Sequence, residues 1–505
     1  MEFIDEETKR FCFFDEVVSF YKPVSVFGIS ANLLPLKGEE LRGHFEFLSK
    51  VKACEYNRVR IENILRDFHE ISGSMLSIEN GTSTDVDLFE IKRFVHHHKI
   101  LKQLSGCVAD FFGDLDELWE LLDPKQSGSF SFMPENELID ALIEKHKSLK
   151  RRIDGLYKER IKFISEKFNF DLGDRRFVIE RDKAGALIDS NFVMIEREGM
   201  KTYTLVVRPT EEIMVKENEL HALEEEIKIA EDEEIKRLSK AVEQWITLIK
   251  AEIKKIADFD VALARVKAIK DGYVFPQFGK EINLEESFHP VVSNLVKKDN
   301  FEYVPLSGKF SQGLTMIFGP NMGGKTTVLR TLAISCALAM HGFLVPAKSA
   351  VLPEIDWVRF VGSSSQSLGL SGFASQIDRM SDTLKMNRKG LILVDEFGSG
   401  TNPYEGEALA TALAEYLSYS KHFSVMVTHF RRTIEKVKCD KYTIGMINFE
   451  GEINARNLNS KINHHLINGD IVNYGDAIKI AGILGLPAEI VEKAREFLEN
   501  NFENR

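Results

Sequence analysis

The sequence predicts a multidomain protein: an α-helical core and lever with a small β tip, followed by an α/β domain around a glycine-rich loop and a C-terminal helical element. Three observations predict this fold. Apolar residues recur at helical spacing through most of the first 270 residues. The spacing becomes strand-like only between Arg175 and Val207. After Asp271 and Gly272, mixed strand and helix patterns begin, and they surround the glycine-rich loop near Gly319.

The length of 505 residues exceeds what one ordinary core supports, so about two to four domains are expected. We place the boundaries where the apolar period changes. The expected parts are a helical core and first lever arm (1–167), a small β clamp-like tip (168–209), a returning lever helix and core (210–272), the α/β domain (273–462) and a C-terminal helical element (463–505).

Composition narrows the class of protein. Hydrophobic content of 44% with 29% charged residues is typical of a globular chain. No run approaches ~20 apolar residues, and the acidic start lacks the basic residues of a signal peptide, so we expect a cytoplasmic protein that does not contact a membrane. The net charge of -12 argues against coating nucleic acid through bulk electrostatics, but it leaves a local basic surface open.

Isolated cysteines and one histidine cluster raise the question of metal sites. The five cysteines are scattered singly, which predicts buried thiols rather than a zinc site. His96, His97 and His98 follow one another within a predicted helix. Adjacent residues on a helix point in different directions, so we predict a solvated helix face here rather than a metal site.

The predicted tip consists of three short strands, around Phe177, Phe192 and Tyr203. Basic residues alternate with acidic ones in this segment. A tip that contacts a nucleic-acid duplex and an ordinary solvated sheet therefore both remain open.

The returning helix is expected from about Thr210 to Ala257, with an apolar stripe that predicts a packing face. Its first half is crowded with glutamates and includes the acidic run Glu231 to Glu234. This surface should repel phosphate, so the arm is a poor candidate for direct DNA contact. Two helical stretches that flank a small β segment predict a lever with a tip.

The glycine-rich loop has the pattern of a phosphate-binding loop between a strand and a helix. Glycines let the backbone curl around phosphates. Lys325 is predicted to reach the β and γ phosphates, and the Thr326 hydroxyl to bind Mg²⁺. The predicted nucleotide-binding residues of this loop are Gly319, Pro320, Asn321, Met322, Gly323, Gly324, Lys325, Thr326 and Thr327.

Two later strands are expected to bring further chemistry to the same edge. An apolar run from Leu391 ends in Asp395 and Glu396. Hydrolysis needs one carboxylate in the Mg²⁺ shell, assigned to Asp395, and one that orients the attacking water, assigned to Glu396. The run from Val425 ends at His429, which we predict to donate to the γ-phosphate. The predicted catalytic residues are therefore Glu396, His429 and Lys325.

These segments resemble the MutS family of ATPases, relatives of the ABC class. The resemblance lies in the glycine loop, in Val394-Asp-Glu-Phe-Gly-Ser-Gly-Thr-Asn-Pro-Tyr-Glu-Gly, in Val427-Thr-His-Phe and in Phe288-His-Pro-Val-Val. The end of the chain, from Tyr474, is similar to the family's C-terminal helical dimerisation element. The likeness spans most of the chain and implies an α/β P-loop (ABC-type) ATPase domain that uses ATP and Mg²⁺.

The resemblance also implies roles for single residues. Asn321 corresponds to the family's phosphate-loop asparagine, and Phe301 to the aromatic residue that stacks on adenine. Ser371 lies in the signature loop, which in this family reaches the nucleotide of the opposite subunit. A homodimer, or a heterodimer with a related chain, would then have two sites, each completed by the partner.

The sequence departs from the family's mismatch readers in two respects. The helical core begins almost at Met1, so the N-terminal mismatch-recognition domain is expected to be missing. The form of Gly400 to Gly406 is closer to the short branch that does not read mismatches, yet the nuclease-type domain of that branch is also expected to be missing.

Two functions therefore remain open. The first is a dimeric ATPase that uses its nucleotide state to clamp DNA, whether mismatched, duplex or branched. The alternative is an ATP-driven conformational factor or chaperone that acts on a protein partner without DNA binding.

Overall fold

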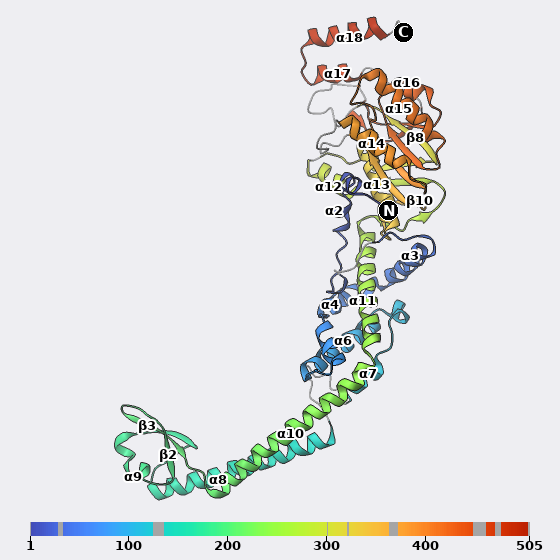
Figure 1. Cartoon of the computed structure of the whole chain (residues 1–505). Helices are drawn as coiled ribbons and strands as arrows, with labels where there is room; N and C mark the ends of the chain where they lie inside the picture. Colours follow the sequence, from blue (N-terminus) through green and yellow to red (C-terminus); the bar gives the residue numbers. More distant parts are fainter. Residues whose placement is uncertain are drawn as a thin grey trace. The chain divides into compact units, whose positions relative to one another are not determined.

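The computed structural model describes residues 2–28, 34–124, 136–299, 301–320, 323–362, 372–447, 461–469 and 476–502. The chain divides into two compact units (Figure 1). The first unit contains Met1–Arg66, Leu104–Ala109 and Lys255–Arg505, and the second contains Asp67–Gln103 and Asp110–Lys254. This division differs from the expected boundaries at the N-terminal end, because the first 66 residues cluster with the α/β part.

The second unit is mainly helical. Its helices are α5 (Ser72–Glu79), α6 (Asp85–Leu104), α7 (Asp116–Leu122), α8 (Glu137–Phe168), α10 (Glu211–Glu243) and the first part of α11 (Ile246–Lys267). Helices α8 and α10 lie side by side (Figure 1). The side chains of Asn136 and Thr210 cap them by accepting hydrogen bonds from Ile139 N and Ile213 N. A short turn after Glu243 divides the expected returning helix into α10 and α11.

The three-stranded antiparallel sheet between α8 and α10 has the order β1-β3-β2. Its strands are β1 (Arg176–Glu180), β2 (Val193–Glu198) and β3 (Thr202–Val207), with the short helix α9 (Gly185–Ile188) after β1. One apolar cluster joins sheet and helices, because Ile164 of α8, Leu205 of β3 and Ile213 of α10 are buried together. The strands thus form where the alternation predicts them.

The histidine cluster on α6 differs from the prediction. His98 is buried, and its Nε2 lies 2.9 Å from Glu252 Oε2 on α11. A solvated face is therefore wrong for His98, because it shares the inner face of α6 with Phe94 and Leu101. His96 and His97 are half-buried. Within the described residues, no three potential ligands gather to hold a metal ion.

The N-terminal part of the first unit consists of short helices. They are α1 (Glu6–Phe11), α2 (Phe14–Val18), α3 (Gly38–Lys52) and α4 (Arg58–Asp67), with the 3₁₀ turns η2 (Ala53–Asn57) and η3 (Gly106–Phe111). Cys12 and Cys54 are buried there and Cys336 later in the unit, as expected, whereas Cys439 is half-buried. The side chain of Cys107 lies outside the described residues.

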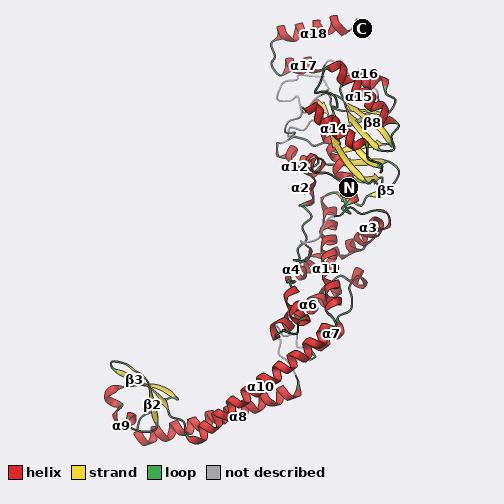
Figure 2. Cartoon of the chain, viewed as in Figure 1, coloured by secondary structure: helices red, strands yellow, loops and turns green. Residues whose placement is uncertain are grey.

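The α/β part contains a six-stranded sheet of order β11-β12-β13-β8-β14-β17 (Figure 2). Its strands are β8 (Gly313–Phe318), β11 (Trp357–Val361), β12 (Gly390–Asp395), β13 (Phe423–Val427), β14 (Asp440–Thr443) and β17 (Ile467–Asn468). All neighbours are parallel except β14 and β17. The strands β8, β12 and β13 are almost wholly buried, as the apolar runs predict for a parallel sheet.

The helices of this part are α13 (Lys325–Met340), α14 (Gly372–Leu384), α15 (Pro403–Ser418) and α16 (Arg431–Lys436). A second sheet has the order β5-β10-β6-β7, with β5 (Gln277–Phe278), β6 (Ile282–Ser287), β7 (Leu306–Phe310) and β10 (Ser349–Leu352). Helix α12 (Pro290–Lys298) follows β6. Two small ladders pair β4 (Tyr273–Val274) with β9 (Val345–Pro346), and β15 (Met446–Ile447) with β16 (Ile462–Asn463).

The sheet continues beyond the expected end of the α/β domain at residue 462, because β17 pairs with β14. The helices α17 (Asp476–Ile483) and α18 (Ala488–Phe502) follow. Among the helices that the structure describes, none combines the length and apolarity needed to cross a membrane.

Candidate functional site

The glycine-rich loop connects β8 to α13 with a backbone that needs glycine. Gly319 has φ +147° and Gly324 has φ +96°, both in the left-handed region. A Cβ atom at Gly319 would lie 1.9 Å from the Ile444 carbonyl oxygen. The loop is therefore pressed against the end of β14, and a side chain at Gly319 would displace it.

Lys325 begins α13 and is almost completely buried. Its Nζ donates to the carbonyl oxygens of Gly319, at 2.8 Å, and Pro320, at 3.3 Å. The Glu396 carboxylate lies 3.9 Å from the same nitrogen. Burial lowers the pKa of Lys325, and the charges of Glu396 and Asp395 oppose that shift. A buried ammonium group thus lies against the loop at the start of a helix, where the helix dipole also favours an anion.

Thr326 and Asp395 bring two oxygen ligands together. The Thr326 hydroxyl donates to Asp395 Oδ2 at 3.0 Å. Burial raises the pKa of Asp395, the hydrogen bond from Thr326 opposes this, and the charge of Glu396 adds to it. A hydroxyl and a carboxylate are the hard ligands that Mg²⁺ prefers. The residues present therefore fit Mg²⁺ with the rest of its shell supplied by water or phosphate.

Glu396 follows β12 in a strained backbone conformation. Its φ of +50° lies in the left-handed region, which costs a non-glycine residue about 1–3 kcal/mol. Its backbone N–H donates to Val427 O of β13 at 3.1 Å. This turn holds the carboxylate beside Lys325, at the carboxyl ends of β8, β12 and β13.

Other predicted residues lie apart from this group or outside the described residues. Phe301 is 50% exposed after α12. His429 is exposed, with its ring centroid 4.6 Å from that of Phe430. Thr327 lies in the first turn of α13, where its carbonyl accepts a hydrogen bond from Thr331. Asn321, Met322 and Ser371 lie outside the described residues.

The structure adds one residue that the sequence analysis missed. His464 Nδ1 lies 3.1 Å from the Gly323 carbonyl oxygen, which accepts the hydrogen bond. The backbone N–H of Gly445 donates to Asn463 O at 2.9 Å and so holds this segment in place. The pair His464 and His465 was visible in the sequence, but spacing alone does not connect it with a loop 141 residues earlier.

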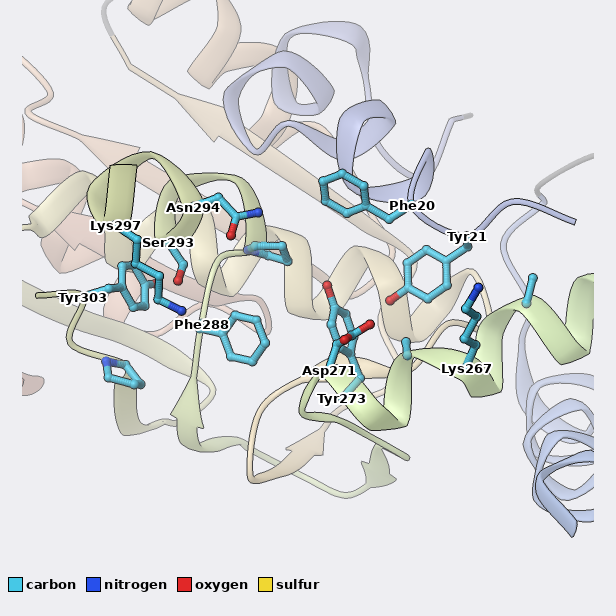
Figure 3. Close-up of a pocket in the computed structure, with 14 residues that line it drawn as sticks. Phe20, Tyr21, Lys267, Asp271, Tyr273, Phe288, Ser293, Asn294, Lys297 and Tyr303 are labelled. Carbon is cyan, nitrogen blue, oxygen red and sulfur yellow. The ribbon is translucent and has the colours of Figure 1, made fainter. Parts of the chain in front are cut away.

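A cavity of about 620 Å³ lies elsewhere in the first unit (Figure 3). Its walls include Tyr21, Tyr273 and Phe288, and Lys267 and Lys297 contribute charge. None of the residues predicted for the glycine loop lines it. The functional groups of opposite charge converge at the loop instead, so the loop is the candidate site.

The fold is that of a multidomain protein with helical and mixed-sheet parts. Its candidate site is a glycine loop between a strand and a helix, with Lys325, Thr326, Asp395 and Glu396 beside it. Residues 315–501 match the family model described as MutS domain V. Similar curated proteins are named DNA mismatch repair protein MutS. The relative from Thermus thermophilus is 30% identical over 294 residues, which are 57% of this chain and 34% of that protein.

Two other relatives with this name extend the likeness. The protein from Finegoldia magna is 26% identical over 87% of this chain and 54% of its own length. The protein from Clostridium beijerinckii is 26% identical over 88% and 51%. The chain is thus similar to MutS proteins over most of its length and matches MutS domain V in its C-terminal part, and the predicted resemblance is confirmed. It spans between about a third and about a half of the length of these relatives.

Proposed function

We propose that the chain is an ATPase that binds and hydrolyses Mg²⁺·ATP at the glycine loop. One observation carries the proposal. Lys325, Thr326, Asp395 and Glu396 meet at the carboxyl ends of the parallel strands, with a hydroxyl-carboxylate distance of 3.0 Å and an ammonium-carboxylate distance of 3.9 Å. Ligands of open parallel sheets bind at this edge.

Each residue of the site has a separate role in this proposal. Loop amides and the start of α13 would receive the phosphates, and Lys325 would exchange its loop carbonyls for the β and γ phosphate oxygens. Thr326 and Asp395 would hold Mg²⁺, which when bound neutralises charge on the phosphates. Glu396 would orient the attacking water, and His429 would donate to the γ-phosphate. Phe301 would stack on the adenine.

The functional state in this proposal is a dimer with composite sites. Ser371 of each chain would reach the nucleotide of the other. The C-terminal segment supports association, because several of its apolar side chains are exposed, although Val491 is buried. The exposed ones are Leu484, Leu486, Ile490, Phe497 and Leu498, between 40% and 69% exposed. Such a face on neighbouring helices fits a second copy of the same helices. ATP binding would close the pair, and hydrolysis would release it.

The partner that the dimer clamps is proposed to be DNA. The support is the name of the relatives, DNA mismatch repair protein, together with the paired helices α8 and α10 and their β-sheet tip. The nucleotide state would control whether the arms grip the duplex.

A specific observation favours the alternative of a protein partner. Three basic side chains of the tip are already paired with glutamates. The pairs are Arg176 with Glu196, Arg181 with Glu198 and Lys183 with Glu180, each at 2.6 Å. Paired cations attract phosphate less strongly, so the tip offers DNA less charge than its composition suggests.

Two measurements test these proposals. Lys325→Ala should abolish binding of a fluorescent ATP analogue, whereas Lys162→Ala, which removes an exposed charge on α8, should not. Binding of duplex and branched DNA over a salt series then separates the partners. A clamp requires DNA affinity that falls steeply with salt. The protein partner is the better proposal if the chain binds neither DNA at low salt in the presence of a non-hydrolysable ATP analogue.

A further inference from the structure

The cavity of Figure 3 lies between segments that are far apart in the sequence. Its walls come mainly from the residues that follow α2, from the end of α11 and from α12. Every lining residue belongs to the first unit and to the described part of the chain. Its volume of about 620 Å³ falls within the range of roughly 300–1,000 Å³ that small-molecule sites occupy. The cavity is therefore large enough for a compact organic ligand.

Three aromatic side chains, Tyr21, Tyr273 and Phe288, line the cavity and are here called the aromatic wall. Tyr273 is buried and meets Tyr21 and Phe288 edge to face, with ring centroids 5.9 Å and 5.7 Å away. Phe20 lines the same cavity and is 57% exposed, so a large apolar ring meets water there. A ligand with a flat ring would stack on such side chains and remove apolar surface from water.

The charged groups of the cavity favour an anion. Lys267 and Lys297 are exposed, and no ion pair joins either ammonium group to a carboxylate of the described residues. Figure 3 shows these two lysines at opposite ends of the aromatic wall. Among the lining residues, Asp271 is the single carboxylate. Two cations against one anion leave a net positive charge, which attracts a phosphate or carboxylate group.

A buried hydroxyl in the aromatic wall also lacks a partner. Tyr21 is 8% exposed, and its hydroxyl makes no hydrogen bond of good geometry with any described residue. Figure 3 shows this hydroxyl directed toward the other lining side chains. Burial raises the pKa of Tyr21, so the hydroxyl keeps its proton and can donate. A buried donor without a partner destabilises the fold unless a ligand or water supplies an acceptor.

We propose that this cavity is a second binding site, separate from the glycine loop, for a small organic anion that carries a flat aromatic ring. The ring would stack on the aromatic wall and cover Phe20, and the anionic group would pair with Lys267 or Lys297. An acceptor on the ligand would receive the Tyr21 hydroxyl. Nucleoside monophosphates and aromatic carboxylates share this chemistry. The site does not depend on the proposed ATPase activity, because none of the glycine-loop residues lines the cavity.

Isothermal titration calorimetry with the full chain tests the site. The probes are adenosine monophosphate and naphthoate, which is an aromatic carboxylate. At least one of them should bind once per chain, and Lys325→Ala, which disables the glycine loop, should change its affinity by less than about twofold because the sites are independent. The probe that binds identifies the source of the anion. Ribose phosphate has the charge but no aromatic ring, so it should bind at least about tenfold more weakly.

Two matched pairs of variants locate the binding. Lys297→Gln and Lys267→Gln each remove one charge from the cavity and should weaken the bound probe by at least about threefold. Lys298→Gln and Lys270→Gln are the controls, because these lysines do not line the cavity. Their affinities should stay within about twofold of the unmodified value. All four lysines are exposed, so the substitutions leave the core unchanged.

Failure of both probes to bind at millimolar concentration would overturn the second site. Binding that Lys325→Ala abolishes would also overturn it, because the probe would then occupy the glycine loop. Binding that Lys297→Gln and Lys267→Gln both leave unchanged would place the probe on another surface, with the same consequence. None of these outcomes bears on ATP binding and hydrolysis, which separate measurements test.

Discussion

At the scale of single residues, the contact of His464 with the glycine loop has a direct consequence. The peptide bond is planar, so the Gly323 C=O and the Gly324 N–H point in opposite directions. A hydrogen bond that fixes the Gly323 carbonyl toward His464 therefore also fixes the direction of the next amide. That amide is one of those proposed to receive phosphate.

His464→Ala should weaken ATP affinity by roughly threefold to tenfold, the loss expected for one hydrogen bond. His464→Asn keeps a donor near the position of Nδ1 and should restore much of the affinity. Equilibrium titration with a fluorescent ATP analogue measures both variants, with exposed His465→Ala as control. Unchanged affinity in His464→Ala would show that the contact does not support the loop.

Two histidines, the buried His289 and the half-buried His44, make stability depend on pH. Burial and the nearby charge of Arg265 lower the pKa of His44 to about 4. Burial also lowers the pKa of His289 to about 4. The His289 ring caps α12 by accepting from Val292 N, and its other nitrogen faces Cys12 O. Both histidines are thus neutral in the folded chain at neutral pH.

The sign of the effect follows from proton uptake. Below the ordinary histidine pKa of 6.5, the unfolded chain binds protons that the folded chain does not. Stability is therefore lost as the pH falls from about 6.5 toward 4, by roughly 2 kcal/mol per histidine at pH 5. Urea denaturation at pH 7.5 and pH 5 measures the loss, and His289→Asn should reduce it. The same pH slope in that variant would contradict the assignment to His289.

The residues of the candidate site were predictable to different degrees. Lys325, Thr326, Asp395 and Glu396 could be placed together because each follows or precedes a strongly apolar strand, and the ends of parallel strands meet at one edge. His464 could not, because its contact depends on how β16 and the end of β14 meet the loop. The burial of His98 could not be predicted either, because it depends on a contact with Glu252, which is far away in the sequence.

At the scale of elements, the sequence predicted those strands whose pattern of apolar residues is visible within one short segment. The strands β1, β2 and β3 fall in the segment of strand-like spacing, and β8, β12 and β13 are apolar runs, so all six were visible in the sequence. The second sheet was not, because its short strands pair across distant segments, as β10 does with β5 and β6. The attachment of the first residues to β11 likewise depends on a bridge between Ile4 and Val358, which are far apart in the sequence.

The exposed face of α17 and α18 gives a prediction for these elements. Phe497 is 69% exposed and lies on the apolar side of α18. If a second copy covers this face, Phe497→Glu places a charge in the interface and should weaken the dimer by at least about tenfold in dissociation constant. Sedimentation velocity over a concentration series measures this. Glu496→Gln is the matched control, and an unchanged constant for Phe497→Glu would exclude this face from the interface.

At the scale of the whole molecule, the proposed function requires a nucleotide shared between two chains. In the proposed function, the glycine loop and carboxylates supply one half of the nucleotide site, and Ser371 of the partner subunit would supply the other half. Nucleotide affinity and subunit association should therefore be coupled, each raising the other by the same factor.

The most direct test is the oligomeric state of the Glu396→Gln variant. This change should leave Mg²⁺·ATP binding intact and prevent hydrolysis, so the closed state accumulates. Sedimentation equilibrium with saturating Mg²⁺·ATP should give twice the mass of one chain, with two nucleotides retained per dimer. A species with the mass of one chain that still holds ATP would contradict the account.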